Sequence, residues 1–248
     1  MEQTQPLAGR SALITGAARR LGAAIARKLH EAGASVVVHY RQSRGEAEAF
    51  VAELNTHRAQ SAMATQCDLV DIDRLPALVE TVVSRFGRLD VLVNNASTFY
   101  PTPLGSITVA QWDDLVGTNL RAPLFLSQAC AAALRSSRGS IINMVDIHGQ
   151  RPLKAHPVYS TAKAGLVMLT RSLARELAPE VRVNGIAPGP VLWPERGVDA
   201  ALKAEIVDKT ALKHAGTPGD VSSAALFLAA YAPFVTGQII AIDGGRSL

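Results

Sequence analysis

The sequence predicts an α/β protein built on a doubly wound, seven-stranded parallel sheet, and three observations support this prediction. Short β-branched and aliphatic runs alternate with longer amphipathic stretches, as in strand–helix–strand units. The short runs are largely apolar, which is typical of strands buried on both faces of a sheet. The 248 residues are 48% hydrophobic and 19% charged, so the chain can bury a large core without disulfides or a structural metal. We expect one domain over residues 1–248.

The first unit lies within the first forty residues. A strand from Ser11 to Thr15 precedes a helix from about Leu21 to Ala32, and Gly33 suits the left-handed end of that helix. Seven strands are predicted in all: Ser11–Thr15, Ser35–Tyr40, Ala62–Gln66, Leu89–Val93, Ser140–Val145, Val181–Ile186 and Gln238–Ile242. Further helices are expected to begin near Gly45, Asp71, Thr108, Ala122, Val158 and Asp220.

One segment, from Pro188 to Pro218, breaks the alternation. Its regular pattern is interrupted at Pro190, Pro194, Gly197 and Gly216. Long irregular loops of this kind are usually functional. In a doubly wound sheet this loop, about residues 190–215, would lie over the carboxyl ends of the strands, where such folds bind ligands.

Charge and composition exclude several classes of function. The net charge is +4 and the isoelectric point is near 9.3, but the basic residues are scattered and only 5% of residues are aromatic, which does not favour nucleic-acid binding. No apolar run has the length of a membrane-spanning helix. Cys67 and Cys130 lie among small or apolar residues, as reduced thiols do, and no secretory signal precedes them. We expect a cytoplasmic protein.

A glycine turn follows the first strand. In the run LITGAARRLG, Gly16 permits a tight turn, and Gly22 allows close packing of helix and sheet with amide N–H groups directed at a phosphate. Arg20 stands where many nucleotide-binding turns have a middle glycine. The alternative is an ordinary glycine-containing turn.

The end of the second strand favours NADP(H) over NAD(H). The residues after His39 and Tyr40 include no Asp or Glu that could bind the ribose hydroxyls. Arg41 can instead form a forked contact with a 2′-phosphate, with Ser43 donating and Arg19 within reach. The alternative is that Arg41 is a solvated loop arginine.

Polar residues also follow the third and fourth strands. Asp68 and Leu69 close the third strand, and Asp68 could accept from the adenine amine. Asn95, Ala96 and Ser97 close the fourth strand at the same expected edge. Turn formation or capping would explain either motif by itself.

Tyr159 and Lys163 are four residues apart and would share one face of a helix. An ammonium near a tyrosine favours the phenolate and brings the pKa of the tyrosine from about 10 towards the working range. Pairs with this spacing also arise by chance in helices.

The motifs in their order resemble the short-chain dehydrogenase/reductase family over essentially the whole chain. They are the glycine turn, Asn-Asn-Ala-Ser, Asn119, Tyr-x-x-x-Lys, Pro188-Gly189-Pro190 and the terminal Thr-Gly-Gln…Asp-Gly-Gly. The resemblance implies a single-domain Rossmann fold, usually in a homotetramer. It makes Tyr159 the acid/base, Lys163 the group that binds the nicotinamide ribose, and Asn119 the holder of a water in the proton relay.

One departure from the family is informative. The family usually has serine thirteen residues before the tyrosine, whereas this chain has Asp146. Reduction of a ring C=N bond requires a proton on nitrogen, which a carboxyl group can supply. Asp146 could instead be a loop or capping acid.

Asp146, together with the runs GAARRLG, HYRQS and NNASTFYPTPL, is similar to the pteridine reductase branch of the family. In that branch the arginine matching Arg20 contacts cofactor phosphate and substrate, the serine matching Ser97 hydrogen-bonds near the pterin, and the aromatic matching Phe99 stacks on it. The pterin would lie between Phe99 and the nicotinamide, unless Phe99 only packs the loop. His148 is assigned no catalytic role, and Trp193 is a candidate wall of the substrate pocket.

The predicted sites are therefore as follows. The catalytic residues are Asp146, Tyr159, Lys163 and Asn119. The cofactor-binding residues are Gly16, Arg19, Arg20, Leu21, Gly22, His39, Tyr40, Arg41, Ser43, Asp68, Leu69, Asn95, Ala96, Ser97, Tyr159, Lys163, Pro188 and Gly189. The substrate-binding residues are Arg20, Ser97, Phe99, Asp146, Tyr159 and Trp193.

The sequence thus favours an NADPH-dependent reductase of a pterin or dihydropterin, with dihydrobiopterin, dihydromonapterin and dihydrofolate as candidate substrates. Two alternatives stay open. One is a general carbonyl reductase of the same family, acting on a 3-oxoacyl group or a sugar ketone. The other is a catalytically silent NADPH-binding protein.

Overall fold

The computed structural model describes residues 5–193 and 199–248 and contains one sheet of seven parallel strands. Their order in the sheet is β3-β2-β1-β4-β5-β6-β7. The chain adds strands on one side of β1 first and then, from β4 onward, on the other side. This is the doubly wound Rossmann arrangement that the sequence predicts. The strands are β1 Ser11–Ile14, β2 Ser35–Tyr40, β3 Ala62–Gln66, β4 Val91–Asn94, β5 Ser140–Met144, β6 Arg182–Pro188 and β7 Ile239–Ile242.

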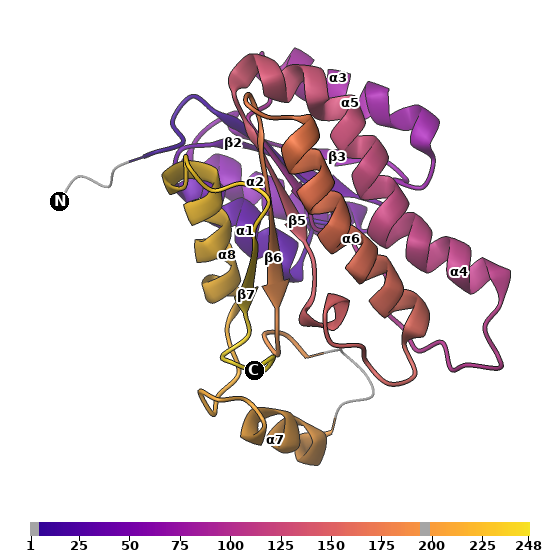
Figure 1. Ribbon diagram of the computed structural model, residues 1–248. Helices are drawn as coiled ribbons and strands as arrows, with labels where there is room; N and C mark the ends of the chain where they lie inside the picture. Colours follow the sequence, from indigo (N-terminus) through magenta and orange to yellow (C-terminus); the bar gives the residue numbers. More distant parts are fainter. Residues whose placement is uncertain (1–4, 194–198) are drawn as a thin grey trace.

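Helices cover both faces of the sheet (Figure 1). The α-helices are α1 Arg20–Glu31, α2 Arg44–His57, α3 Leu75–Phe86, α4 Val109–Val116, α5 Ala122–Ser137, α6 Pro157–Glu176, α7 Ala200–Asp208 and α8 Pro218–Leu226. Alternate residues of each strand face opposite layers: in β1, Ala12 and Ile14 join the core under α1, α2 and α8, and Leu13 joins the core under α3 and α5. The apolar strands are therefore buried on both faces, as their composition predicts.

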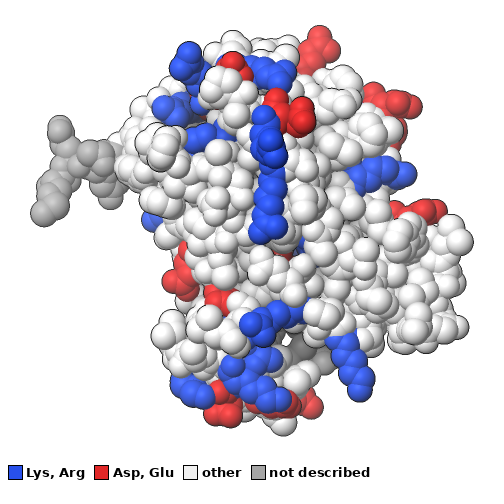
Figure 2. All heavy atoms as spheres, viewed as in Figure 1, with Lys and Arg blue, Asp and Glu red and all other residues white. Residues whose placement is uncertain are grey.

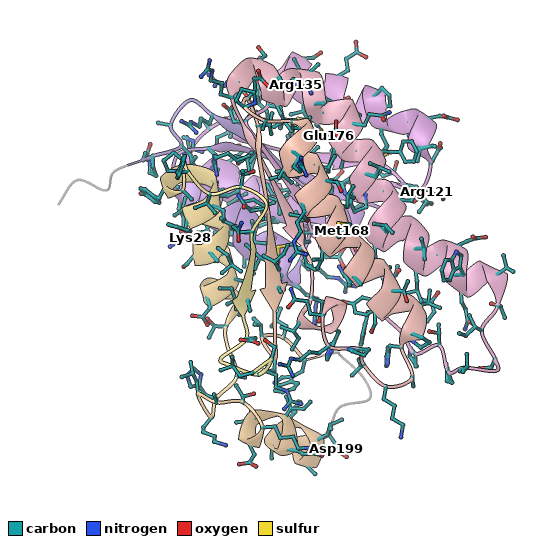
Figure 3. The ribbon with its side chains drawn as sticks, viewed as in Figure 1. Lys28, Arg121, Arg135, Met168, Glu176 and Asp199 are labelled. Atoms are coloured by element: carbon teal, nitrogen blue, oxygen red, sulfur yellow. The ribbon has the colours of Figure 1, made fainter. Side chains whose placement is uncertain are left out.

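The prediction that the segment from Pro188 to Pro218 is irregular was wrong in one part, because it contains α7. Asp199 caps this helix by accepting from the backbone N–H of Leu202 at 2.8 Å (Figure 3). Between the glycines at 197 and 216, the run AALKAEIVD consists mostly of good helix formers. Pro194 and Gly197, predicted as breaks, lie outside the described residues.

Two short π-helical segments, η2 Gly117–Arg121 and η4 Phe227–Tyr231, extend α4 and α8. The 3₁₀ turns are η1 Ile72–Arg74 and η3 Ile147–Gly149. Cys67 and Cys130 are both buried and unbridged. In the described part of the chain, no helix is both long enough and apolar enough to cross a membrane.

Candidate functional site

The glycine turn between β1 and α1 is held by a buried histidine. Gly16 has a φ of +60°, a conformation that favours glycine, and its N–H donates to His39 Nδ1 at 3.2 Å. His39 Nε2 lies 3.0 Å from the carbonyl oxygen of Cys67. The ring therefore accepts at one nitrogen and donates at the other, which requires the neutral form. Burial lowers the pKa of His39 to about 4, consistent with that form.

Gly22 packs against the same turn more closely than any larger residue could. A Cβ atom there would lie 2.4 Å from the carbonyl oxygen of Gly16 and 2.6 Å from Asn95 Nδ2. Asn95 uses this nitrogen to donate to the carbonyls of Thr15 and Gly16, at 2.8 and 3.1 Å. The side chain that follows β4 thus fixes the turn that follows β1.

A pocket of about 350 Å³ opens beside this turn. Of the predicted cofactor residues, those that line it are Gly16, Arg19, Arg20, Leu21, Gly22, His39, Arg41, Asp68, Leu69, Asn95, Ala96 and Ser97. Sequence analysis missed four other lining residues, Val70, Thr98, Thr118 and Leu192. They follow strands or lie in the π-helical segment, where only the fold brings them to the pocket.

Thr118 carries a polar atom suited to a ligand. Its side chain is buried and lines the pocket, and its hydroxyl has no hydrogen-bond partner within the described ranges. A buried hydroxyl without a partner is costly, and a bound molecule can remove that cost. Asp68 also lines the pocket. Its carboxylate accepts from the backbone N–H of Val70 at 3.2 Å and so stabilises the turn after β3.

Arg20 connects the glycine turn to the loop after β6. Its backbone is left-handed, with a φ of +57°, in the position where a glycine would be unstrained. Its guanidinium donates to the carbonyl oxygen of Trp193 at 3.0 Å. The Trp193 ring in turn lies under Lys203 of α7, with 5.9 Å between the Nζ atom and the ring centroid. At this lower end of the molecule, Figure 2 shows Lys and Arg side chains next to Asp and Glu side chains.

The six remaining predicted cofactor residues do not line this pocket: Tyr40, Ser43, Tyr159, Lys163, Pro188 and Gly189. Tyr40 is buried in the core between the sheet and α1 and α2. Ser43 precedes α2 and forms no capping hydrogen bond through its side chain. Gly189 packs against Asp243, where a Cβ atom would come within 2.6 Å of that residue's Cβ. Pro188 ends β6 at the same edge of the sheet.

Asp146 and Tyr159 are brought together by β5 and α6. The Tyr159 hydroxyl donates to Asp146 Oδ2 at 2.7 Å, while Oδ1 of the same carboxylate accepts from the N–H of His148 at 2.8 Å. One oxygen therefore caps η3 and the other contacts the tyrosine. The capping role predicted as the alternative for Asp146 is therefore present, and the contact with Tyr159 is compatible with the predicted role as a second proton source, which stays a prediction.

The structure reverses the direction expected for the Tyr159 pKa. Burial raises this pKa well above 10, and the charge and hydrogen bond of Asp146 raise it further. Lys163 Nζ donates to the carbonyl oxygen of Met144 at 2.9 Å, and burial lowers the lysine pKa to about 8. Tyr159 is therefore protonated at neutral pH, as a proton donor must be.

Asn119 lies fully buried in the π-helical segment η2. Its side-chain oxygen accepts from Ser97 at 2.6 Å, and its amide nitrogen donates to the carbonyls of Thr98 and Leu115, both at 2.9 Å. The side chain thus fixes the strand-end loop beside Tyr159. These bonds hold Ser97 in place and use both amide hydrogens of Asn119, while Oδ1 keeps one lone pair that can accept from a water. The predicted role of Asn119 in holding a water stays a prediction.

Phe99 stands beside Tyr159 with 45% of its surface exposed. The two rings meet edge to face, with 4.8 Å between centroids, and Tyr100 anchors the loop by donating to Asp114 at 2.9 Å. His156, which sequence analysis missed, stacks on Phe99 at 4.8 Å with the planes only 10° apart. The sequence did contain one indication of this position: His156 precedes Tyr159 by three residues at the start of α6, so the two side chains lie on the same side of the helix.

The chain is similar to known proteins over nearly its whole length. Residues 16–247 match the family model described as "Enoyl-(Acyl carrier protein) reductase". The chain is 37% identical to pteridine reductase 1 of Leishmania tarentolae, with 96% of each chain covered. It is equally similar, at 37% with 95% and 97% covered, to the 3-oxoacyl-[acyl-carrier-protein] reductase FabG of Staphylococcus aureus. An uncharacterized oxidoreductase of Methylorubrum extorquens is 36% identical, with 96% and 98% covered.

Proposed function

Since the chain belongs to the short-chain dehydrogenase/reductase family of NAD(P)-dependent reductases, we propose that it uses NADPH to reduce a pterin or dihydropterin ring. Dihydrobiopterin, dihydromonapterin and dihydrofolate are the candidate substrates. One observation carries the proposal: the Asp146 carboxylate is hydrogen-bonded to the Tyr159 hydroxyl at 2.7 Å.

Reduction of a ring C=N bond needs a hydride on carbon and a proton on the adjacent nitrogen. The bound nicotinamide supplies the hydride. Tyr159 is kept protonated by burial and by Asp146, and the pair holds the transferable proton between two oxygens. A ketone needs only a proton at oxygen, which the tyrosine alone can donate. The carboxylate therefore favours a substrate whose nitrogen must be protonated.

The surroundings of the pair suit a flat heterocycle. Phe99 presents an exposed ring next to Tyr159, and His156 packs against Phe99 in parallel. Aromatic faces bind flat rings by offset stacking. Arg20 and Trp193, already joined by a hydrogen bond, would close the side of the slot towards the loop.

The choice of NADPH rests on the charges around the pocket. Arg41 and Arg19 line it, and β2 ends without a carboxylate that could bind ribose hydroxyls or repel a 2′-phosphate. Within the described residues the Thr118 hydroxyl has no partner, so it can donate to an acceptor atom of a nucleotide. Neutral His39 uses both ring nitrogens to hold the glycine turn beside the pocket. Ser43 adds a further hydroxyl near the end of β2.

A 3-oxoacyl reductase is the second candidate, because the chain is as similar to FabG as to pteridine reductase 1. In that case Asp146 would serve only as the cap of η3 through its bond from His148. A silent NADPH-binding protein is disfavoured by the intact Tyr159 and Lys163 pair.

The deciding experiment follows NADPH oxidation with dihydrobiopterin, dihydromonapterin, dihydrofolate and a short 3-oxoacyl thioester. Asp146→Asn keeps an oxygen to accept from His148 but loses the carboxylate, and Asp146→Ser restores the family's usual residue. We expect pterin turnover to fall about 100-fold in both variants. Turnover of the thioester alone, retained in Asp146→Ser, would contradict pterin reduction. NADPH binding without turnover of any substrate would indicate the silent protein.

We also propose that the chain forms a homotetramer. Large apolar side chains are exposed on the later helices, among them Met168 at 58% and Phe227 at 44%, and association would bury such surface. Sedimentation velocity of the purified protein measures this directly, and a monomer at micromolar concentration would contradict it.

A further inference from the structure

A chain of buried polar side chains crosses the molecule from β4 through β5 to α6. Asn94 Nδ2 donates to Asn143 Oδ1 at 2.8 Å, and Asn143 Nδ2 donates to Thr170 Oγ1 at 2.9 Å. The Thr170 hydroxyl donates in turn to the carbonyl oxygen of Leu166 at 2.7 Å. Asn143 and Thr170 are fully buried. Because apolar residues could fill this layer of the core at no hydrogen-bonding risk, the polar chain calls for a specific explanation.

The end of the chain at α6 lies on the same stripe of the helix as the proton-donating residues. Thr170 follows Lys163 by seven residues and Tyr159 by eleven, spacings that place all three on one face. Each has a partner on or just after β5: Thr170 contacts Asn143, Lys163 contacts Met144, and Tyr159 contacts Asp146. Three bonds of 2.7 to 2.9 Å therefore join one stripe of α6 to the carboxyl end of β5.

The other end of the chain leads to the glycine turn. Asn94 pairs in register with Asn143 across the two parallel strands. The next residue, Asn95, donates to the carbonyls of Thr15 and Gly16. The cofactor turn and the helix that carries Tyr159 are thus connected through adjacent residues of β4.

The remaining contacts of α6 restrain it differently. Its inner face packs through Leu166 and Val167 into an apolar cluster, and apolar packing is non-directional. At the far end, the exposed Arg135 donates to the carbonyl oxygen of Glu176 at 3.2 Å, while Met168 lies on the exposed side (Figure 3). On the C-terminal side of Lys163, the hydrogen bond from Asn143 to Thr170 joins the buried face of α6 to the sheet. Among the described residues it is the one hydrogen bond that does so in this part of the helix.

We propose that Asn143 and Thr170 are positioning residues, which hold α6 at the axial position where Lys163 reaches the Met144 carbonyl and Tyr159 reaches Asp146. A small axial displacement of the helix would lengthen both contacts together. Reactions that require near-contact of the reacting atoms are sensitive to such displacements. The inference does not depend on which substrate is reduced.

The test replaces the hydroxyl by a methyl group of the same size in Thr170→Val. The pKa of Lys163 is read by NMR on protein with lysine labelled at the ε carbon with ¹³C, assigned with Lys163→Arg. In the native chain we expect a pKa of about 8. In Thr170→Val we expect it to rise by roughly half a unit or more as the ammonium moves towards water. With a turned-over substrate, kcat should fall about tenfold at unchanged KM for NADPH.

Two further variants separate positioning from stability. Thr170→Ser keeps the hydroxyl and should restore both readouts. Val167→Ala removes apolar contacts from the same helix and should lower the denaturation midpoint while leaving the Lys163 titration and kcat as in the native chain. If Thr170→Val behaves like Val167→Ala, the positioning role is wrong. If Thr170→Val does not fold, Thr170→Ala replaces it in both measurements. The NMR titration of Lys163 tests the positioning role even if the protein reduces no pterin.

Discussion

The cofactor end and the proton-donating end of the site share one edge of the sheet but are held together differently. At the cofactor end, backbone groups and neutral side chains bond to one another, as His39 does between Gly16 and Cys67. At the other end, titratable groups contact each other directly, as Tyr159 and Asp146 do. Fixed dipoles set affinity without changing protonation, whereas coupled titratable groups move protons. Substitutions should therefore separate binding from turnover.

Tyr159→Phe should give the largest effect. It removes the proton donor and keeps the ring against Phe99, so kcat should fall about 1,000-fold. The dissociation constant of NADPH, measured by fluorescence titration, should stay within about twofold, since the phenol does not line the cofactor pocket. A parallel loss of NADPH affinity would break the proposed separation of the two ends.

The second prediction concerns the pH dependence of folding at the cofactor end. The folded pKa of His39 is about 4, below an unfolded value of about 6.5. Below pH 6.5 the unfolded chain binds a proton that the folded chain does not, so stability is lost as the pH falls from about 6.5 to about 4. Between pH 7 and 5 this histidine should contribute a loss of about 2 kcal/mol in the free energy of unfolding.

Urea unfolding of the native chain and His39→Asn at both pH values measures this contribution. Burial also lowers the pKa of His30 to about 4, but that residue is present in both proteins and its effect cancels. An identical pH dependence in the two proteins would show that the ring is charged or exposed in the folded state.

Arg41→Ala should weaken NADPH binding about tenfold, as expected for a lost charge-assisted contact. NADH, which lacks the 2′-phosphate, should bind as before, and kcat at saturating NADPH should be unchanged. Arg44→Ala is the matched control, because Arg44 pairs with Glu48 on α2 and does not line the pocket. If Arg41→Ala lowered the affinity for NADPH and for NADH equally, Arg41 would not recognise the 2′-phosphate.

His156→Ala should give the smallest effect. Loss of the stack on Phe99 removes an aromatic pair, and the KM for the pterin should rise about threefold at constant kcat. His156→Phe keeps the stack and should match the native KM. A fall in kcat in both variants would instead implicate the imidazole in the chemistry.

The periodicity of the sequence was sufficient for the sheet but not for every element. Alternating strand and helix patterns predicted the parallel sheet, because burial on both faces leaves a strong apolar pattern in β1 and β2. The short helix α7 was missed because proline and glycine on both sides dominated its pattern. The π-helical segment η2 was not foreseen either, since one extra residue in a helical turn leaves no periodic trace.

Chain order was sufficient to predict that residues at strand ends lie close together, although cofactor binding by them stays a prediction. Gly16, Asp68 and Asn95 follow three strands and line one pocket. The lowered tyrosine pKa was wrong, because the spacing of Tyr159 and Lys163 gave no measure of burial or of the Asp146 charge. His156 was missed because its partner Phe99 lies 57 residues away in the sequence.

The sequence by itself determined the strand–helix alternation, the family, and the residue types at the strand ends, because backbone preferences and apolar periodicity are local properties. Only the tertiary structure decided which polar groups are paired. It divided the oxygens of Asp146 between His148 and Tyr159. It also left the Thr118 hydroxyl without a partner in the described residues and joined Asn143 to Thr170. Hydrogen bonds and desolvation depend on distances between residues far apart in the chain, which spacing along the sequence does not specify.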